Sequence, residues 1–187
     1  HVVPASLDAE HFEELIVVSI PSSGQQLTHK VIKVGSDPAH DLALLKMTNF
    51  ALPPLALDES IRAKEGQAIA FTGFPLLGVL GLTPATHRGI VASITPIVLP
   101  QANSTQLNAQ AVRQIREGSF SVLQLDATAY PGNSGSPLFD PDSGAVIGIV
   151  NMVFVKGSKE SALSAPSGIT YAIPIRYLKD LLSSLHR

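Results

Sequence analysis

Short runs of apolar and β-branched residues, each closed by turn residues, recur along the whole chain. The first run, residues 15–20, ends at Pro21-Ser22-Ser23-Gly24, which favours a hairpin turn. The other strand candidates share this pattern and cover residues 27–34, 42–47, 67–72, 89–94, 121–125, 145–155 and 169–173. Many short strands separated by Gly and Pro predict an antiparallel barrel or sandwich rather than alternating strand–helix units.

Three segments have a helical pattern instead. Residues 174–187 place Ile175, Leu178, Leu182 and Leu185 on one face, which fits 3.6 residues per turn. Pro174 suits the first turn of a helix. We therefore expect a C-terminal helix packed on the barrel. Shorter helical patterns cover residues 6–15 and 104–118.

Composition narrows the class of protein. The chain has 187 residues, enough for one domain or two closely packed lobes. Thirteen Lys and Arg residues against 15 Asp and Glu give a net charge of -2, which argues against nucleic acid or an anionic membrane surface as a partner. The chain is 45% hydrophobic and its mean hydropathy is +0.26, so it can bury a large core. It contains no apolar run of 18 residues, and no membrane span is predicted.

The sequence contains no cysteine. This excludes disulfides, thiolate nucleophiles and Cys-based metal sites together. The first residue is His1 rather than Met, so we expect the chain to begin inside a longer gene product.

The most specific local motif is Pro131-Gly132-Asn133-Ser134-Gly135-Ser136-Pro137. A nucleophilic serine needs an exposed Oγ and backbone N–H groups directed at the oxyanion that forms during acyl transfer. Glycines on both sides of Ser134 permit the tight turn that this requires. An isolated G-N-S-G is equally typical of an ordinary turn between strands, but here a turn at Ser143-Gly144 and a second apolar strand follow the motif.

The stretch resembles the trypsin-like serine proteases of the HtrA/DegP type, in which G-N-S-G-[GS]-P, a turn and a V-I-G-I strand come in this order. Leu125-Asp126-Ala127 is similar to the T-D-A of that family, and residues 168–174 resemble its entry to the final helix. The resemblance runs from about residue 15 to the C-terminus. It is weakest over residues 96–120, where we expect an insertion.

This resemblance implies an all-β fold: a two-lobed antiparallel β-barrel of the chymotrypsin/trypsin type with a C-terminal α-helix. We expect one protease domain over 1–187, with roughly 1–95 in the N-terminal barrel, 120–173 in the C-terminal barrel and 174–187 in the helix. From this resemblance we also expect that residues 1–187 include neither the first strands of the family nor a PDZ domain.

The orienting acid is Asp41 by resemblance, because Asp37-Pro38-Ala39-His40-Asp41-Leu42-Ala43 is similar to the D-P-x-x-D-[IL]-A of the family. Taken alone, Asp41 is as readily explained as a turn residue. In a triad, such an aspartate holds the imidazole in the correct tautomer. Asp37 is the competing acid.

The base is sought among six histidines, namely His1, His11, His29, His40, His87 and His186. Adjacent side chains of a strand point to opposite faces, so His40 is not expected to pair with Asp41. We interpret His29 and His87 as satisfied surface imidazoles; His11 lies in an expected insertion, and His186 at a helix end. His1-Val2-Val3 matches the T-x-x-H-V-[IV] of the family, which favours His1. The alternative is that His1 is the remnant of an affinity tag.

By resemblance, the oxyanion hole comprises Gly132, Asn133 and Ser134, with N–H groups from Gly132 and Ser134 and with Asn133 shaping the turn. The primary substrate pocket is expected at Thr128, Ala129, Tyr130, Val150, Asn151 and Met152. These residues are uncharged, which argues against cleavage after Lys or Arg and favours a small or medium apolar residue. Glutamyl endopeptidases share the G-N-S-G-S-P motif but carry a histidine where this chain has Val150. A core role competes for Ile149 and Val150.

The sequence therefore predicts a serine endopeptidase that cleaves peptide bonds of protein substrates through His1, Asp41 and Ser134 and an acyl-enzyme. The alternative is a catalytically silent peptide-binding or chaperone-like module on the same fold, and a plain structural domain comes third. We expect no metal or organic cofactor and no nucleic-acid partner. The oligomeric state is open, and resemblance alone suggests the periplasm or cell envelope.

Overall fold

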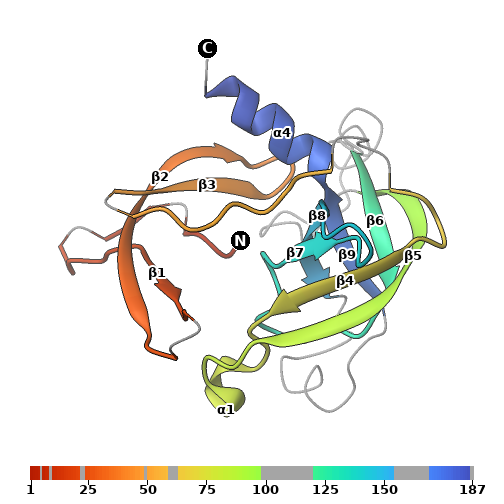
Figure 1. Cartoon of the computed structure of the whole chain (residues 1–187). Coiled ribbons are helices and arrows are strands. Elements are labelled where there is room, and N and C mark those ends of the chain that lie inside the picture. Colours follow the sequence, from red (N-terminus) through yellow and green to blue (C-terminus); the bar gives the residue numbers. More distant parts are fainter. Residues whose placement is uncertain are drawn as a thin grey trace, which may run out of the picture. The chain divides into compact units, whose positions relative to one another are not determined.

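The computed structural model describes residues 1–4, 6–8, 10–21, 24–48, 50–58, 63–97, 120–153 and 169–185. The chain separates into two compact units (Figure 1). The first comprises His1–Pro54 with Asp180–Arg187, and the second comprises Leu55–Lys179. Within the described residues, no helix is both long and apolar enough to cross a membrane.

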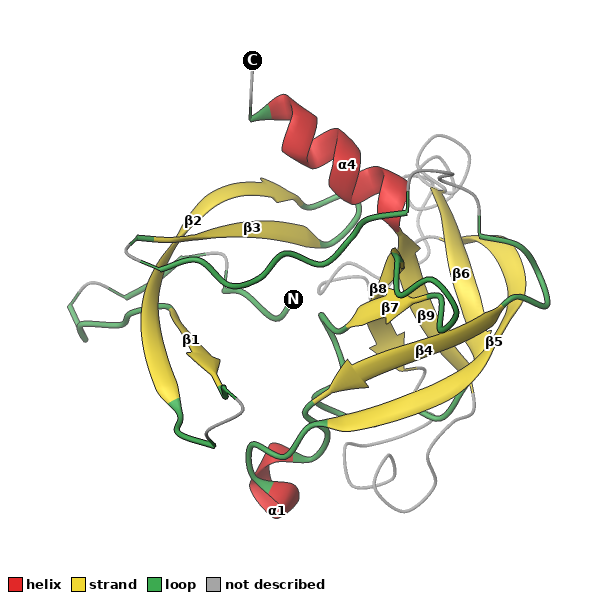
Figure 2. Cartoon of the chain, in the orientation of Figure 1, coloured by secondary structure: helices red, strands yellow, loops and turns green. Residues whose placement is uncertain are grey.

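The first unit is built on a three-stranded antiparallel sheet in the order β1-β2-β3, drawn in yellow in Figure 2. The strands are β1 (Ile16–Ser19), β2 (Leu27–Asp37) and β3 (Leu42–Met47). The predicted hairpin is confirmed, since the Gly24 N–H donates to the Pro21 carbonyl at 2.8 Å and β1 pairs with β2. The turn after β2 is short, and Asp41, the residue before β3, has a left-handed backbone with φ of 53°.

The second unit is a closed barrel with the strand order β4-β5-β6-β9-β8-β7. Its strands are β4 (Ala68–Gly73), β5 (Ala85–Ile97), β6 (Phe120–Asp126), β7 (Pro137–Phe139), β8 (Val146–Val153) and β9 (Ile169–Pro174). Apolar side chains fill it, including Ile69, Phe71, Val91, Leu123, Leu125, Leu138, Ile147 and Val150. Burial of these alternating apolar positions explains why the strands close on one another.

Most predicted strands are confirmed, but two short elements were missed. Strand β7 has only three residues, too few to display alternation, and α1 (Leu77–Leu80) has four. Strands β4 and β5 belong to the same barrel as the strands after residue 120. The division between the compact units therefore falls after residue 54, whereas the sequence was interpreted with a first barrel reaching residue 95.

The C-terminal helix is confirmed as α4 (Ile175–Ser184), with Pro174 as the last residue of β9 rather than in the first helical turn. Ile175 and Leu181 are the buried residues of α4, whereas Leu185 is 45% exposed. The predicted helix over 104–118 and the expected insertion in 98–119 lie outside the described residues.

The predicted helix over residues 6–15 is wrong, since the described residues of this segment form a turn. The Asp8 carboxylate accepts the N–H groups of Glu10 and His11 at 2.9 and 3.2 Å. Phe12 has a φ of 55°, outside the helical region. An aspartate that bonds the backbone competes with helical hydrogen bonding, and a left-handed residue ends it.

Candidate functional site

The loop between β6 and β7 carries Ser134. Along residues 132–135, N–H groups without an acceptor among the described residues alternate with N–H groups that donate to a main-chain carbonyl. The Asn133 N–H donates to the Tyr130 carbonyl at 3.0 Å, and the Gly135 N–H donates to the Val150 carbonyl at 2.7 Å. In the described part of the chain, the N–H groups of Gly132 and Ser134 have no acceptor. The N–H groups of Gly132 and Ser134, one on each side of Asn133, are therefore available to donate to an incoming anionic oxygen.

Two glycines make this backbone attainable, since Gly132 and Gly135 have φ values of 102° and 87°. Only glycine adopts such angles without strain. A Cβ on Gly132 would also lie 2.5 Å from the Phe74 carbonyl oxygen, which leaves no room for a side chain.

The Ser134 side chain is half-buried, and its hydroxyl donates to the main-chain carbonyl of Asn151 in β8 at 2.9 Å. No sequence pattern predicts this contact, because any residue type can supply a main-chain acceptor. Transfer of the Ser134 proton to a base requires the hydroxyl hydrogen to turn away from Asn151.

The Asn133 side chain is fully buried, with 0% of the residue exposed. Its amide nitrogen and oxygen have no hydrogen-bond partner among the described residues. Gly73 lies against it, since a Cβ built on Gly73 would be 2.7 Å from Asn133 Oδ1. An unpaired buried amide costs about 1–3 kcal/mol. Because the Asn133 N–H is bonded to Tyr130, this residue shapes the loop and offers no main-chain donor to a substrate.

In the first unit, the structure brings His1 and Asp41 together. The main-chain nitrogen of His1 donates to Asp41 Oδ1, and His1 Nδ1 contacts Asp41 Oδ2. An ionised carboxylate only accepts hydrogen bonds, so Nδ1 carries the proton. With Nδ1 donating to the carboxylate, Nε2 is the ring nitrogen that can accept a proton, which is the arrangement that a general base needs.

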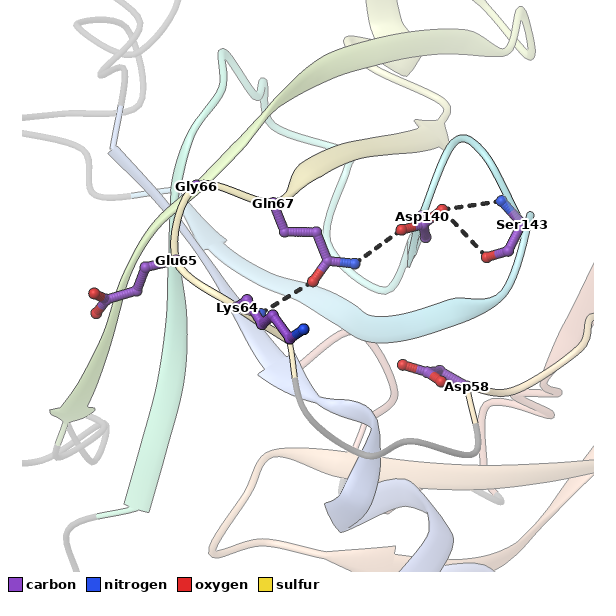
Figure 3. A pocket seen from close by; sticks show the side chains of 7 residues that line it. All are labelled: Asp58, Lys64, Glu65, Gly66, Gln67, Asp140 and Ser143. Atoms are coloured by element: carbon purple, nitrogen blue, oxygen red, sulfur yellow. Dashed lines mark hydrogen bonds between the residues drawn. The ribbon is translucent and has the colours of Figure 1, made fainter.

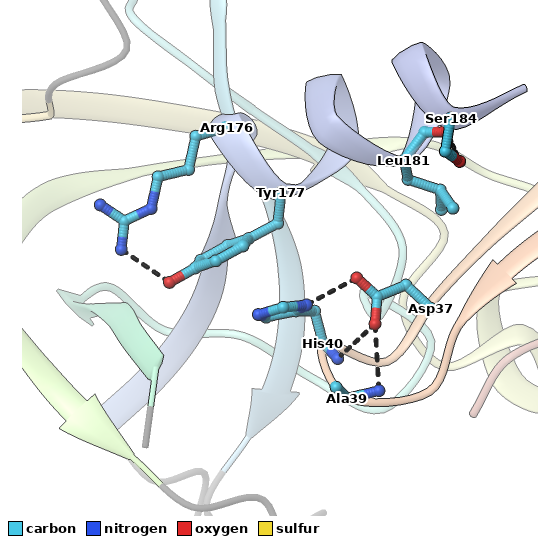
Figure 4. Close-up of polar contacts among 7 residues, drawn as sticks. All are labelled: Asp37, Ala39, His40, Arg176, Tyr177, Leu181 and Ser184. Atoms are coloured by element: carbon cyan, nitrogen blue, oxygen red, sulfur yellow. Dashed lines mark hydrogen bonds and ion pairs between the residues drawn. The ribbon is translucent and has the colours of Figure 1, made fainter. Parts of the chain in front are cut away.

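The turn before Asp41 is held by Asp37, which ends β2 (Figure 4). Asp37 Oδ1 accepts the N–H groups of Ala39 and His40 at 3.1 and 3.3 Å, and Asp37 Oδ2 accepts from His40 Nδ1 at 2.6 Å. The strand argument against His40 was wrong, because residues 38–41 form a turn. Instead, the His40 Nδ1 atom is hydrogen-bonded to Asp37 Oδ2.

The remaining described histidines differ from one another. His11 is exposed and pairs with Asp8, while His29 in β2 bonds the Ser19 hydroxyl at 2.8 Å. The interpretation of His87 as a satisfied surface imidazole was wrong. His87 lies inside β5, and its Nε2 is buried without a partner among the described residues. Burial lowers the pKa of His87 from its usual 6.5. Its neighbours are the stacked Phe71 ring at 5.0 Å and the tilted Tyr130 ring at 5.9 Å.

The residues expected to wall the substrate pocket separate into two groups. Ala129 and Val150 are 1% and 0% exposed and belong to the barrel core. Thr128 is exposed and Tyr130 half-buried, while Asn151 is 4% exposed. The Met152 side chain lies outside the described part of the structure. Thr128 and Tyr130 therefore remain the accessible members.

A separate polar cavity of about 550 Å³ lies in the second unit (Figure 3). It is lined by Asp58, Lys64, Glu65, Gly66, Gln67, Asp140 and Ser143. Asp140 is already engaged there, since it accepts from the Ser143 N–H and from Gln67 Nε2, both at 2.9 Å. Hydrogen bonds from the Ser143 N–H, Gln67 and the Asp142 N–H lower the pKa of Asp140. Nowhere in the described ranges do three or more His, Asp or Glu side chains form a group that could hold a metal ion.

Comparison with known proteins finds similarity to a trypsin-like peptidase domain and to DegP-like serine endoproteases. A family model described as a trypsin-like peptidase domain matches residues 1–149. A protein of Halomonas elongata named "Probable periplasmic serine endoprotease DegP-like" is 33% identical over 170 residues, which are 91% of this chain and 30% of that protein. A protein of Pseudomonas fluorescens with the same name is 31% identical over 152 residues, 81% of this chain and 26% of its own length. This chain thus spans under a third of these relatives.

Among solved structures, the HtrA-type protease AlgW with a decapeptide is similar, with a TM-score of 0.63 and 28% identity. The match covers 91% of this chain and 44% of that one. The closed six-stranded barrel, the additional sheet and the C-terminal helix agree with this likeness.

Proposed function

Because this chain belongs to the trypsin-like peptidase domain family, we propose that it is a serine endopeptidase that cleaves peptide bonds through Ser134, His1 and Asp41. The observation that carries the proposal is the alternation of N–H groups around Ser134. Asn133 and Gly135 donate to carbonyl groups, while Gly132 and Ser134 have no acceptor within the described residues. Such a pair of amides is what a tetrahedral oxyanion requires.

The mechanism follows from the tautomer of His1. With Nδ1–H donating to Asp41, Nε2 accepts the Ser134 proton as Oγ attacks the substrate carbonyl. The Gly132 and Ser134 N–H groups stabilise the oxyanion, and the imidazolium then protonates the leaving amine. Water, deprotonated by the same Nε2 atom, hydrolyses the acyl-enzyme and restores the Ser134 hydroxyl.

We propose protein or peptide substrates, with support from the relatives named as serine endoproteases and from AlgW, which was solved with a decapeptide. The relatives named as periplasmic support the same compartment for this protein. The accessible pocket residues Thr128 and Tyr130 are uncharged. This favours cleavage after a small or medium apolar residue, because binding of Lys or Arg needs an acid in the pocket.

The activity is tested by labelling the full chain with a fluorophosphonate probe. Ser134→Ala should lose all labelling, and the matched Ser143→Ala control, in an exposed turn, should label like the original protein. The proposal fails if the folded protein is not labelled, or if Ser134→Ala labels at the original rate.

The specificity is tested with peptides that differ only in the residue before the scissile bond. Cleavage after Ala or Val should exceed cleavage after Lys or Arg by at least about tenfold in kcat/KM. An equal or reversed preference would contradict the proposed apolar pocket.

One observation favours the second function, a catalytically silent peptide-binding module. The Ser134 hydroxyl is bonded to the Asn151 carbonyl in this structure. An unlabelled but folded protein whose peptide affinity is unchanged by Ser134→Ala would support this second function.

A further inference from the structure

The His40 side chain closes the turn that leads from β2 into β3 (Figure 4). Asp37 holds His40 at two points, since Oδ1 accepts its main-chain N–H at 3.3 Å and Oδ2 lies 2.6 Å from its ring Nδ1. Both side chains are mostly shielded from water, with 22% of His40 and 26% of Asp37 exposed. The turn is also short, because Asp37 pairs directly with Leu42. Residues 38–41 therefore have little freedom to change conformation while these contacts last.

A second turn of the first unit has the same arrangement. Asp8 Oδ1 accepts the main-chain N–H of His11 at 3.2 Å, and Asp8 Oδ2 lies 2.7 Å from His11 Nδ1. In both turns the aspartate also accepts the N–H group of the residue two positions after it. The spacing D-x-x-H and these three contacts are therefore shared by two segments whose other residues differ.

Each of these histidines is followed by a residue in the left-handed region. Phe12, after His11, has a φ of 55°, and Asp41, after His40, has a φ of 53°. Among the described residues other than glycine, only these two and Leu76 have a positive φ. A residue with a side chain rarely adopts this conformation unless surrounding contacts impose it. Because the same angle follows the same contacts at two different residue types, we attribute it to the Asp–His turn.

The left-handed residue has a different environment in the two turns. Phe12 is 89% exposed, whereas Asp41 contacts His1 through both carboxylate oxygens. A return of Asp41 to the usual φ near −60° would rotate its Cβ by roughly 110° about the N–Cα bond. Such a rotation would carry the carboxylate away from His1. The contact between Asp41 and His1 therefore depends on the left-handed backbone.

We propose that His40 is a positioning residue for the reaction, because its ring hydrogen bond to Asp37 holds the backbone that presents the Asp41 carboxylate. A hydrogen on Nδ1 is compatible with both the neutral and the protonated ring, so the contact requires no charge on His40. The D-P-x-x-D pattern leaves the residue at position 40 open. The catalytic consequence of this inference rests on the proposed endopeptidase function.

The test places a side-chain donor at different positions after the turn. The amide nitrogen of His40→Asn lies near the position of Nδ1, that of His40→Gln lies near the position of Nε2, and His40→Ala removes the donor. The matched control is His11→Ala, which removes the same ring contact from the turn that ends at Phe12. All variants are made in the full chain, and circular dichroism and melting temperatures check that they are folded.

We expect His40→Ala and His40→Gln to lower kcat for peptide hydrolysis at least about tenfold, with KM changed less than about twofold, because the orienting acid acts on proton transfer rather than on substrate binding. His40→Asn and His11→Ala should retain kcat within about threefold. In an Asp41→Asn background, His40→Ala should cause less than about twofold further loss, because residues that act as a unit are not additive.

The backbone of residue 41 is measured by NMR whether or not the protein is active. A positive φ brings the N–H and Hα hydrogens of one residue close together, which gives a strong NOE between them. This NOE should be strong at Asp41 in the original protein and weaken in His40→Ala. It should persist in His40→Asn and in His11→Ala.

An unchanged NOE at Asp41 in His40→Ala would overturn the inference. Equal kcat in His40→Ala and His11→Ala would also overturn it, and so would losses from His40→Ala and Asp41→Asn that multiply. A folded original protein that neither reacts with fluorophosphonate nor cleaves peptides would instead remove the proposed function. In that case, an NOE that weakens in His40→Ala alone would still support the role of His40 in holding the Asp41 backbone.

Discussion

At the scale of single residues, the chemistry of the Ser134 loop depends on positions where a side chain cannot be accommodated. Gly132 has a left-handed φ and lies against the Phe74 carbonyl. Asn133 buries a side-chain amide that has no partner among the described residues. These two residues restrict the backbone on both sides of the Gly132–Asn133 peptide.

We expect Gly132→Ala to lower kcat by about 10²–10³, comparable to the loss of one oxyanion donor, since the new Cβ would displace the peptide. Kinetics on a chromogenic peptide would measure this. Gly144→Ala is the matched control, because Gly144 also has a positive φ of 71° but open space around a Cβ. Gly144→Ala should cost about 1 kcal/mol of stability and leave kcat unchanged. Equal kcat losses in the two variants would contradict this account.

At the scale of elements, the turn between β2 and β3 sets the backbone that presents Asp41. Asp37 accepts two main-chain N–H groups of the turn and the His40 ring. Asp41 follows with a left-handed φ of 53° and contacts His1. The D-P-x-x-D pattern is therefore a structural unit in which the first aspartate organises the turn that ends at the second.

We predict that Asp37→Ala destabilises the protein by about 1–2 kcal/mol, because two turn N–H groups and the His40 ring lose their acceptor. Urea-induced unfolding measures the change in the free energy of unfolding. Asp37→Asn retains an acceptor oxygen for Ala39 and His40, so it should cost less than half as much. A larger loss in Asp37→Asn than in Asp37→Ala would refute the role of these hydrogen bonds.

At the scale of the whole molecule, the closed barrel of the second unit holds a half-buried titratable ring whose Nε2 atom is buried. His87 in β5 stacks on Phe71, and burial lowers its pKa below 6.5. The unfolded chain binds a proton at this histidine at a higher pH than the folded chain does. Stability therefore falls as the pH drops from above 6.5 toward the lowered pKa.

We expect His87→Phe, which keeps an aromatic ring between Phe71 and Tyr130, to gain stability relative to the original protein as the pH falls from 7.5 to 5. Other titrating groups are common to both proteins and cancel in the difference. Urea unfolding at several pH values tests this, and a stability difference independent of pH would contradict a lowered pKa of His87.

The strands were predictable where a run was long enough to show its pattern, as for residues 42–47, which match β3 to the residue. The candidate residues Ser134 and Asp41 came from short motifs with characteristic spacing. Strand β7 was not predicted, because three residues are too few to show the periodicity of a strand. A helix was predicted over residues 6–15, where the structure has a turn, because the Asp8 carboxylate accepts main-chain N–H groups in place of helical carbonyls.

The sequence by itself determined the types of residue available for chemistry, the strand-rich class and the loop that carries Ser134, because each depends on neighbours a few positions apart. The tertiary structure decided which N–H groups have acceptors, that Ala129 and Val150 belong to the core, and that the Nε2 atom of His87 is buried. It also decided that Leu76 meets Pro131. These outcomes depend on the register in which β4 and β7 pair within a closed barrel, and no local pattern encodes that register.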